Sequence, residues 1–129
     1  MTYITQDWVE TASEQEVFDY VSNHLLKQNC KSEVGGAPLY LNNTEEDGVD
    51  LRCAAGCLFR DEDEVNNLLN EELEYKMWNQ LVNRGHVPNN QQDLIEELID
   101  IHDLREPEHW SQLLFQLAVE RGLTSNSFV

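Results

Sequence analysis

Apolar residues recur at helical spacing along most of this chain, and they alternate with polar residues in only one short stretch. Stripes of apolar side chains three or four positions apart run through residues 17–25, 65–82, 94–101 and 110–118. The alternating stretch lies at the end of residues 39–53. This segment also contains Asp47-Gly48, a dipeptide typical of hairpin turns. A lone hairpin is marginal in water, so it has to pack on helices. The pattern predicts an α+β fold, mainly helical, with about four helices packed on a short β-hairpin.

Local signals place the ends of several helices. Ser13 and Glu16 have the spacing of a capping box before the first stripe. Pro107 suits the first turn of the last helix, and Gly122 suits its C-terminal cap. Between 65 and 82 the pattern allows one long helix or two short ones.

No linker or repeat divides the 129 residues, which have the length of one domain. We therefore expect a single domain over 1–129, with 1–12 irregular and both 1–12 and 124–129 loosely ordered.

The charge balance restricts the partners of the chain. Twenty-five Asp and Glu stand against eight Lys and Arg, a formal net charge of −17. Such a chain should repel nucleic-acid phosphates and anionic membranes. Solubility alone requires a net charge with a magnitude of about 2–8. Three explanations remain open: a surface for a basic partner, adaptation to a salty interior, or a cation site.

Targeting signals are not expected in this sequence. Residues 1–20 hold five acids and no Lys or Arg, unlike a secretory or transit leader. No apolar stretch approaches the roughly 18 residues of a membrane span. The three cysteines are an odd number, which favours free thiols in a reducing compartment. We expect a cytoplasmic protein without membrane contact.

Acidic residues concentrate in the second half of the chain. Residues 61–108 contain fourteen acids and three basic residues. This region is either a solvated acidic face or a surface that imitates duplex phosphates and binds a basic groove. The candidate partner-binding face consists of ten acids: Asp61, Glu62, Asp63, Glu64, Glu71, Glu72, Glu74, Glu96, Glu97 and Asp100.

Motifs that carry catalysis are missing from the sequence. It has no glycine-rich phosphate loop and no nucleophile elbow. Cys53 and Cys57 have loose zinc-ligand spacing, but their apolar flanks favour buried thiols. His102 and Asp103 are helical neighbours, which do not face each other, so they predict a buried histidine rather than a catalytic dyad. We expect no catalytic residue, metal or cofactor.

A small-ligand site is the alternative function. In this hypothesis the segment after the hairpin forms the floor of a pocket. An arginine beside it binds an anionic nucleotide or metabolite. The candidate residues are Arg52, Cys53, Gly56, Arg60 and His102. A metal-dependent enzyme is the third hypothesis.

Four segments together resemble a family of small uncharacterised phage and bacterial proteins. They are the helix at 16–26, the hairpin leading into the segment at 51–62, the stretch Ile101-His102-Asp103, and a tryptophan helix ending in Arg121-Gly122-Leu123. The family has a Cys-Ala-x-Gly-x-Leu-Ile-Pro-Asp segment, and this chain departs from it at Phe59-Arg60. The resemblance implies a phage or prophage setting and no particular activity.

Charge, missing motifs and resemblance together predict a non-catalytic acidic interaction protein. We expect a phage-type modulator, acting in host takeover or against host defence, that covers a basic surface on a host protein. Its partner would be a nucleic-acid-binding or defence enzyme, and nucleic-acid mimicry is one form of the prediction. The oligomeric state stays open.

Overall fold

The computed structural model describes residues 3–44, 49–73 and 76–124. Its helical elements are η1 (Asp7–Thr11), α1 (Glu14–Gln28), η2 (Gly56–Leu58), α2 (Asp63–Glu71), α3 (Trp78–Asn83), α4 (Gln92–Leu104) and α5 (Pro107–Arg121). The strands are β1 (Glu33–Val34), β2 (Ala37–Pro38), β3 (Leu41–Thr44) and β4 (Val49–Arg52). The predicted α+β, mainly helical class is confirmed.

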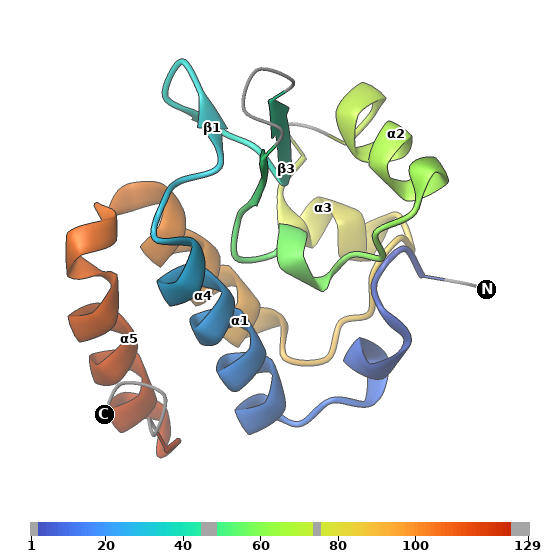
Figure 1. The fold of residues 1–129 in the computed structure, drawn as a ribbon. Helices are drawn as coiled ribbons and strands as arrows, with labels where there is room; N and C mark the ends of the chain where they lie inside the picture. The colour runs from blue at the N-terminus through green and yellow to red at the C-terminus, as the bar shows by residue number, and fades with distance from the viewer. Residues whose placement is uncertain (1–2, 45–48, 74–75, 125–129) are drawn as a thin grey trace.

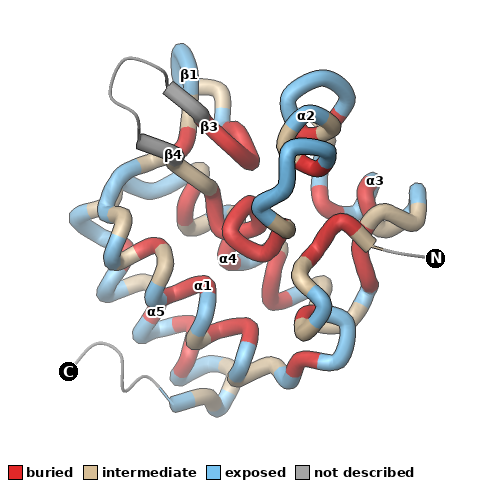
Figure 2. The backbone as a smooth tube through the Cα atoms, turned by 45° about the vertical axis from the view of Figure 1, so that its right-hand side comes forward, coloured by how far each residue is buried: buried red, intermediate tan, exposed pale blue. Residues whose placement is uncertain are grey.

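Three helices pack together on one side of the molecule. α1, α4 and α5 contact one another pairwise, and Figure 1 shows them side by side below the two hairpins. Their inward faces are buried, as the red segments of Figure 2 show. Trp110 and Phe18 are among the largest side chains enclosed there. In the described part of the chain, no helix combines the length and the apolar character needed to cross a bilayer.

The helix ends follow the local sequence signals. Ser13 and Glu16 form both hydrogen bonds of the capping box at α1. Pro107 is in the first turn of α5, and Gly122 ends that helix with a left-handed backbone, φ 69°. The 65–82 segment forms two helices. Asn66, Asn67 and Asn70 have weak helix propensity, which is consistent with the early end of α2.

The two hairpins pack above the helices. β3 pairs antiparallel with β4, from Leu41 opposite Arg52 to Thr44 opposite Val49, which confirms the hairpin predicted in 39–53. Its predicted Asp47-Gly48 turn lies outside the described residues. The stretch 30–38, whose Gly35-Gly36-Ala37-Pro38 is typical of a loop, contains the two-residue pair β1–β2 around Gly35-Gly36. Both glycines have positive φ, which favours glycine in a tight turn.

The N-terminal segment contacts the core. Residues 1–12 were expected to be irregular, but η1 forms within them. Thr5 makes an isolated bridge with Phe59, and Val9 is fully buried. These long-range contacts hold the segment against η2. No local pattern in the sequence predicts them. Residues 125–129 of the tail lie outside the described range.

Candidate functional site

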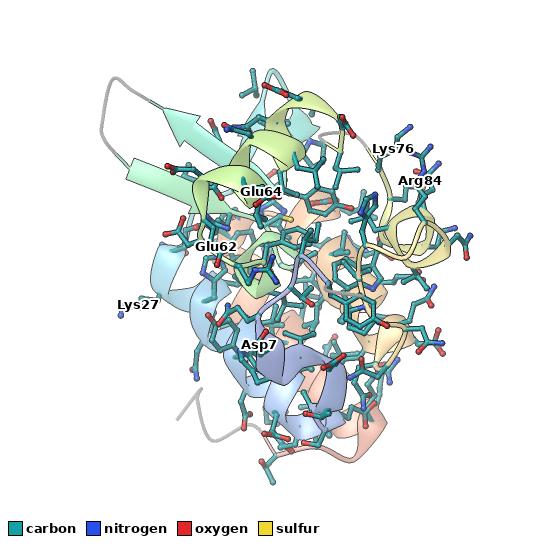
Figure 3. The ribbon with its side chains drawn as sticks, turned by 90° about the vertical axis from the view of Figure 1, so that its right-hand side faces the viewer. Asp7, Lys27, Glu62, Glu64, Lys76 and Arg84 are labelled. Carbon is teal, nitrogen blue, oxygen red and sulfur yellow. The ribbon has the colours of Figure 1, made fainter. Side chains whose placement is uncertain are left out.

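Two of the predicted acids, both just before α2, neutralise arginines. Asp61 forms an ion pair with Arg52 at 3.2 Å, and Glu62 forms one with Arg60 at 3.0 Å. All four side chains line a cavity of about 520 Å³ beside η1 and α1. In Figure 3 Glu62 lies next to this part of the chain. These carboxylates are therefore less available to a basic partner than their exposure alone suggests.

The acids of α2 are exposed at both ends of the helix. Asp63 and Glu64 are in its first turn, where the helix dipole stabilises a negative charge. Glu71 is its last residue and Glu72 its C-cap. All four are solvent-exposed and have no ion-pair partner among the described side chains. Glu74 lies outside the described residues.

The acids of α4 separate into two groups. Glu97 accepts a hydrogen bond from Arg121 at 3.0 Å on the α5 side. Glu96 and Asp100 instead line a different cavity of about 590 Å³, which also contains Asp103. The ten predicted acids therefore do not all lie on one surface. Two line the arginine cavity, four lie at the ends of α2, and two line the cavity beside α4. Of the other two, Glu97 pairs with Arg121, and Glu74 lies outside the described residues.

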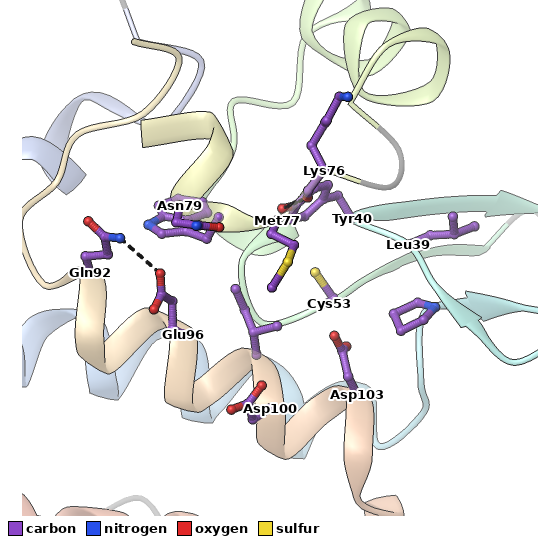
Figure 4. Close-up of a pocket in the computed structure, with 13 residues that line it drawn as sticks. Leu39, Tyr40, Cys53, Lys76, Met77, Asn79, Gln92, Glu96, Asp100 and Asp103 are labelled. Carbon is purple, nitrogen blue, oxygen red and sulfur yellow. Dashed lines mark hydrogen bonds between the residues drawn. The ribbon is translucent and has the colours of Figure 1, made fainter. Parts of the chain in front are cut away.

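This second cavity, which we call the α4 pocket, has one acidic wall and one largely apolar wall. α4 contributes Gln92, Glu96, Ile99, Asp100 and Asp103. The opposite wall includes Tyr40, Met77 and Trp78. Figure 4 shows Glu96, Asp100 and Asp103 along one side of the helix, with Met77 extending toward them. The spacing of four and then three residues explains why one helix presents all three carboxylates together.

The three carboxylates differ in their partners. Glu96 accepts a hydrogen bond from Gln92 at 3.0 Å, and Asp103 accepts one from His102 at 2.6 Å. Asp100 has no partner among the described residues. Burial raises the pKa of Asp100, and the negative charges of Asp103, Glu96 and Glu97 raise it further. The acidic wall therefore carries crowded, uncompensated charge.

The residues of the predicted small-ligand pocket are not brought together. Arg52 and Arg60 line the cavity beside η1, whereas Cys53 lines the α4 pocket. His102 lines neither. Gly56 has a packing role, because a Cβ there would lie 1.8 Å from the Tyr40 carbonyl oxygen. Both arginines are also engaged: Arg52 donates to the Gly56 carbonyl and Asn66 as well as Asp61, and Arg60 donates to the Tyr3 carbonyl.

The two cysteines of this segment are buried, as predicted. Cys53 and Cys57 are free thiols enclosed in the core. Burial raises the pKa of Cys53 to about 12 and holds that of Cys57 well above its usual range. Both thiols are therefore protonated at neutral pH and poor nucleophiles. Among the described side chains, no group of three or more His, Cys, Asp and Glu is arranged to hold a metal ion.

The prediction that His102 and Asp103 do not face each other is wrong. Ser32 donates its backbone N–H to His102 Nε2 at 2.9 Å, so the ring proton is on Nδ1. That Nδ1–H donates to Asp103 at 2.6 Å. The ring is only 1% exposed, and it stacks on Trp110. The predicted buried histidine is confirmed, and both of its nitrogens are used structurally.

Sequence reasoning missed the apolar wall of the α4 pocket. The sequence does not show whether Tyr40 and Trp78 belong to the core or to an interface. The hydroxyl of Tyr40 donates to the Lys76 carbonyl, which holds the two halves of this wall together. Met77, on the same wall, is 68% exposed, and no local pattern in the sequence predicts that exposure.

Comparisons with known proteins give no relative for this chain. No family model matches it. No curated protein matches it at a significant level, and no solved structure does either.

Proposed function

We propose that this chain is a non-catalytic interaction protein that binds a basic surface of another protein through exposed carboxylates. The observation that carries the proposal is the position of Glu71 and Glu72 at the C-terminal end of α2. The helix dipole puts partial negative charge at that end, so carboxylates there are unfavourable. A partner that supplies cations would offset this cost on binding.

The basic residues support the same conclusion. Lys31, Arg52, Arg60 and Arg121 each form an ion pair with an acid of the same chain. They reduce the negative charge near α1 and α5 but leave the acids of α2 uncompensated. In Figure 3 Glu64 lies in this region, and the labelled cations Lys76 and Arg84 lie together at one edge of the same view. The remaining excess of negative charge favours a cationic partner.

The biological setting belongs to the proposal as well. The chain acts as a phage-type modulator in the host cytoplasm, and its partner is a basic nucleic-acid-binding or defence enzyme. The net charge of −17 and the resemblance of four segments to small phage and bacterial proteins support this setting. The carboxylates of α2 would occupy the place that nucleic-acid phosphates take in the partner's groove.

The small-ligand alternative has weaker support. Its two arginines already bind carboxylates of the same chain, so an incoming anion would first have to displace Asp61 or Glu62. The metal-dependent enzyme receives no supporting geometry from the described residues.

A capture experiment followed by a binding measurement tests the proposal. Tagged protein is incubated with bacterial lysate at about 0.1 M and about 1 M salt, between which the Debye length falls from about 10 Å to about 3 Å. We expect a basic protein that is retained only at the lower salt. The purified partner is then titrated with the variant Glu71→Gln/Glu72→Gln, which should bind roughly tenfold more weakly.

The matched control removes two charges elsewhere. Glu10 and Glu120 are exposed and lie on η1 and α5. The variant Glu10→Gln/Glu120→Gln should bind the partner almost as well as the unchanged protein. Equal losses in both variants would mean that only net charge matters and would refute a binding surface on α2. Retention of no basic protein at either salt would refute the proposed function itself.

A further inference from the structure

The α4 pocket has the charge pattern of a site for an organic cation. Three carboxylates line one wall, and Asp100 has no partner among the described residues. The cationic side chain on the rim, Lys76, extends away from them in Figure 4. The α4 side of the pocket thus carries negative charge, with Glu96 and Asp103 half-buried and Asp100 exposed, that no cation of the described part of the chain neutralises. A cation entering it would relieve the repulsion among these carboxylates.

The geometry favours an organic cation over a metal ion. Glu96, Asp100 and Asp103 line one pocket, but no three acidic, histidine or cysteine side chains of the described chain can converge on a metal. The facing wall includes Tyr40, Met77 and Trp78, which suit an aliphatic stem and an aromatic contact with a cation. A volume of about 590 Å³ is far larger than one ion needs. A long side chain with a charged end fits both walls.

A peptide fits the pocket better than a free amine. Trp78 lines the pocket, and its indole N–H is enclosed by protein atoms without a hydrogen-bond partner in the described chain. A buried donor left unsatisfied costs about 1–3 kcal/mol. An arginine or lysine residue carries a carbonyl acceptor beside its cationic side chain, whereas a simple alkyl amine or guanidine has no such oxygen.

We propose that the α4 pocket receives an arginine or lysine side chain of the basic partner, with Asp100 binding its charged group. This inference rests on the proposed function for the source of the cation. It adds a defined anchoring site to the diffuse attraction of the α2 carboxylates. Arginines that fill a partly apolar pocket are among the residues that contribute most to binding at protein interfaces.

The tryptophan indole signals in a proton–nitrogen NMR spectrum provide the test. Trp8 and Trp110 have bonded indole groups outside the pocket, donating to Gln6 and to the Arg105 carbonyl, so they are internal controls. The probes are acetyl-Gly-Arg-Gly-amide, its lysine counterpart, a neutral citrulline counterpart, and agmatine. The two cationic peptides should shift the Trp78 signal in a saturable way. The citrulline peptide should not.

The key variant is Asp100→Asn, and Glu120→Gln is its matched control. The first should weaken binding of the arginine peptide by about tenfold or more, the loss expected for a hydrogen bond to a charged group. The control removes the same charge from α5, outside the pocket, and should change binding less than about twofold. Unchanged Trp110 signals show that each variant is folded.

The outcomes separate this inference from the proposed function. If a basic protein is captured but neither cationic peptide shifts Trp78, the pocket assignment is wrong and the α2 surface stands. If agmatine binds as tightly as the arginine peptide, the site takes a free small cation and the assignment to a partner residue is overturned. If the peptides bind but no basic protein is captured, the proposed function fails while the cation site remains.

Discussion

At the residue scale, His102 shows how one side chain connects distant parts of the fold. Its two ring nitrogens join the backbone at Ser32 to Asp103 on α4, and its face stacks on Trp110 of α5. The ring therefore joins the loop after α1 to two helices. Its location in the core explains why it does not contribute to either cavity.

Replacing His102 by Phe should destabilise the protein. The aromatic ring could still stack on Trp110, but the buried Ser32 N–H would lose its acceptor, at a cost of about 1–3 kcal/mol. Urea unfolding gives the free-energy difference. His109→Gln is the matched control, since this side chain is 60% exposed, and it should stay within about 0.5 kcal/mol. A His102→Phe variant as stable as the unchanged protein would contradict the role of this bond.

Replacing Asp100 by Asn should have the opposite effect on stability. Asp100 is three or four residues from Glu96, Glu97 and Asp103, and each like-charge pair on a helix costs roughly 0.2–0.5 kcal/mol. The folded-state pKa of Asp100 is raised, so its ionised form is destabilising at neutral pH. The gain from Asn should be full above that pKa and fade as the pH falls toward the ordinary value of 3.8. A variant less stable at neutral pH would contradict this sign.

At the scale of elements, η2 is fixed by close packing under the hairpin. Gly56 begins η2, and the backbone of Tyr40 occupies the place of any side chain there. Cys53 and Ala54, just before it, are also buried. The small residues of this segment are therefore needed so that β4 can lead directly into the core, whatever binds to the surface.

Gly56→Ala should destabilise the protein by about 3 kcal/mol or more, because overpacking against backbone cannot relax by a change of rotamer. Gly35→Ala is the comparison. A Cβ at Gly35 meets nothing within 4 Å, so only its positive φ of 60° costs energy, about 1 kcal/mol. Thermal unfolding of the two variants should rank them clearly, and equal stabilities would show that the loop before η2 moves aside.

At the scale of the whole molecule, repulsion among the acidic side chains destabilises the folded state. The chain has a net charge of −17. Among the described residues, only some of the basic side chains form ion pairs with acids. Repulsion of this kind opposes the compact state and is screened by salt. Both acidic regions would gain from a cationic partner, so binding and stability are coupled.

Raising sodium chloride from about 0.1 M to about 1 M should increase the melting temperature at neutral pH, because screening weakens the repulsion. The control is the same titration near pH 4.3, the isoelectric point of the sequence. There the net charge vanishes, and added salt should stabilise the protein much less. An equal increase at both pH values would assign the effect to general salting-out rather than to charge.

The sequence by itself determined the features that depend on neighbours within a few residues. The Ser13 box, the Pro107 start and the Gly122 cap each involve bonds or backbone angles inside one turn of helix. Such interactions can be predicted because both partners are close in the chain. Apolar periodicity likewise predicted the helical faces and the pairing of β3 with β4, since each pattern specifies which side of an element is buried.

Only the tertiary structure decided which of these faces meet. The α4 pocket joins Tyr40, Met77 and α4. Of the residues predicted for the small-ligand site, Arg52 and Arg60 line the cavity beside η1, whereas Cys53 lines the α4 pocket. Periodicity gives the direction of a side chain but not its partner across the fold. His102 met Asp103 because burial of the ring outweighed the usual separation of helical neighbours. Those contacts depend on how the helices pack, a property of the whole chain.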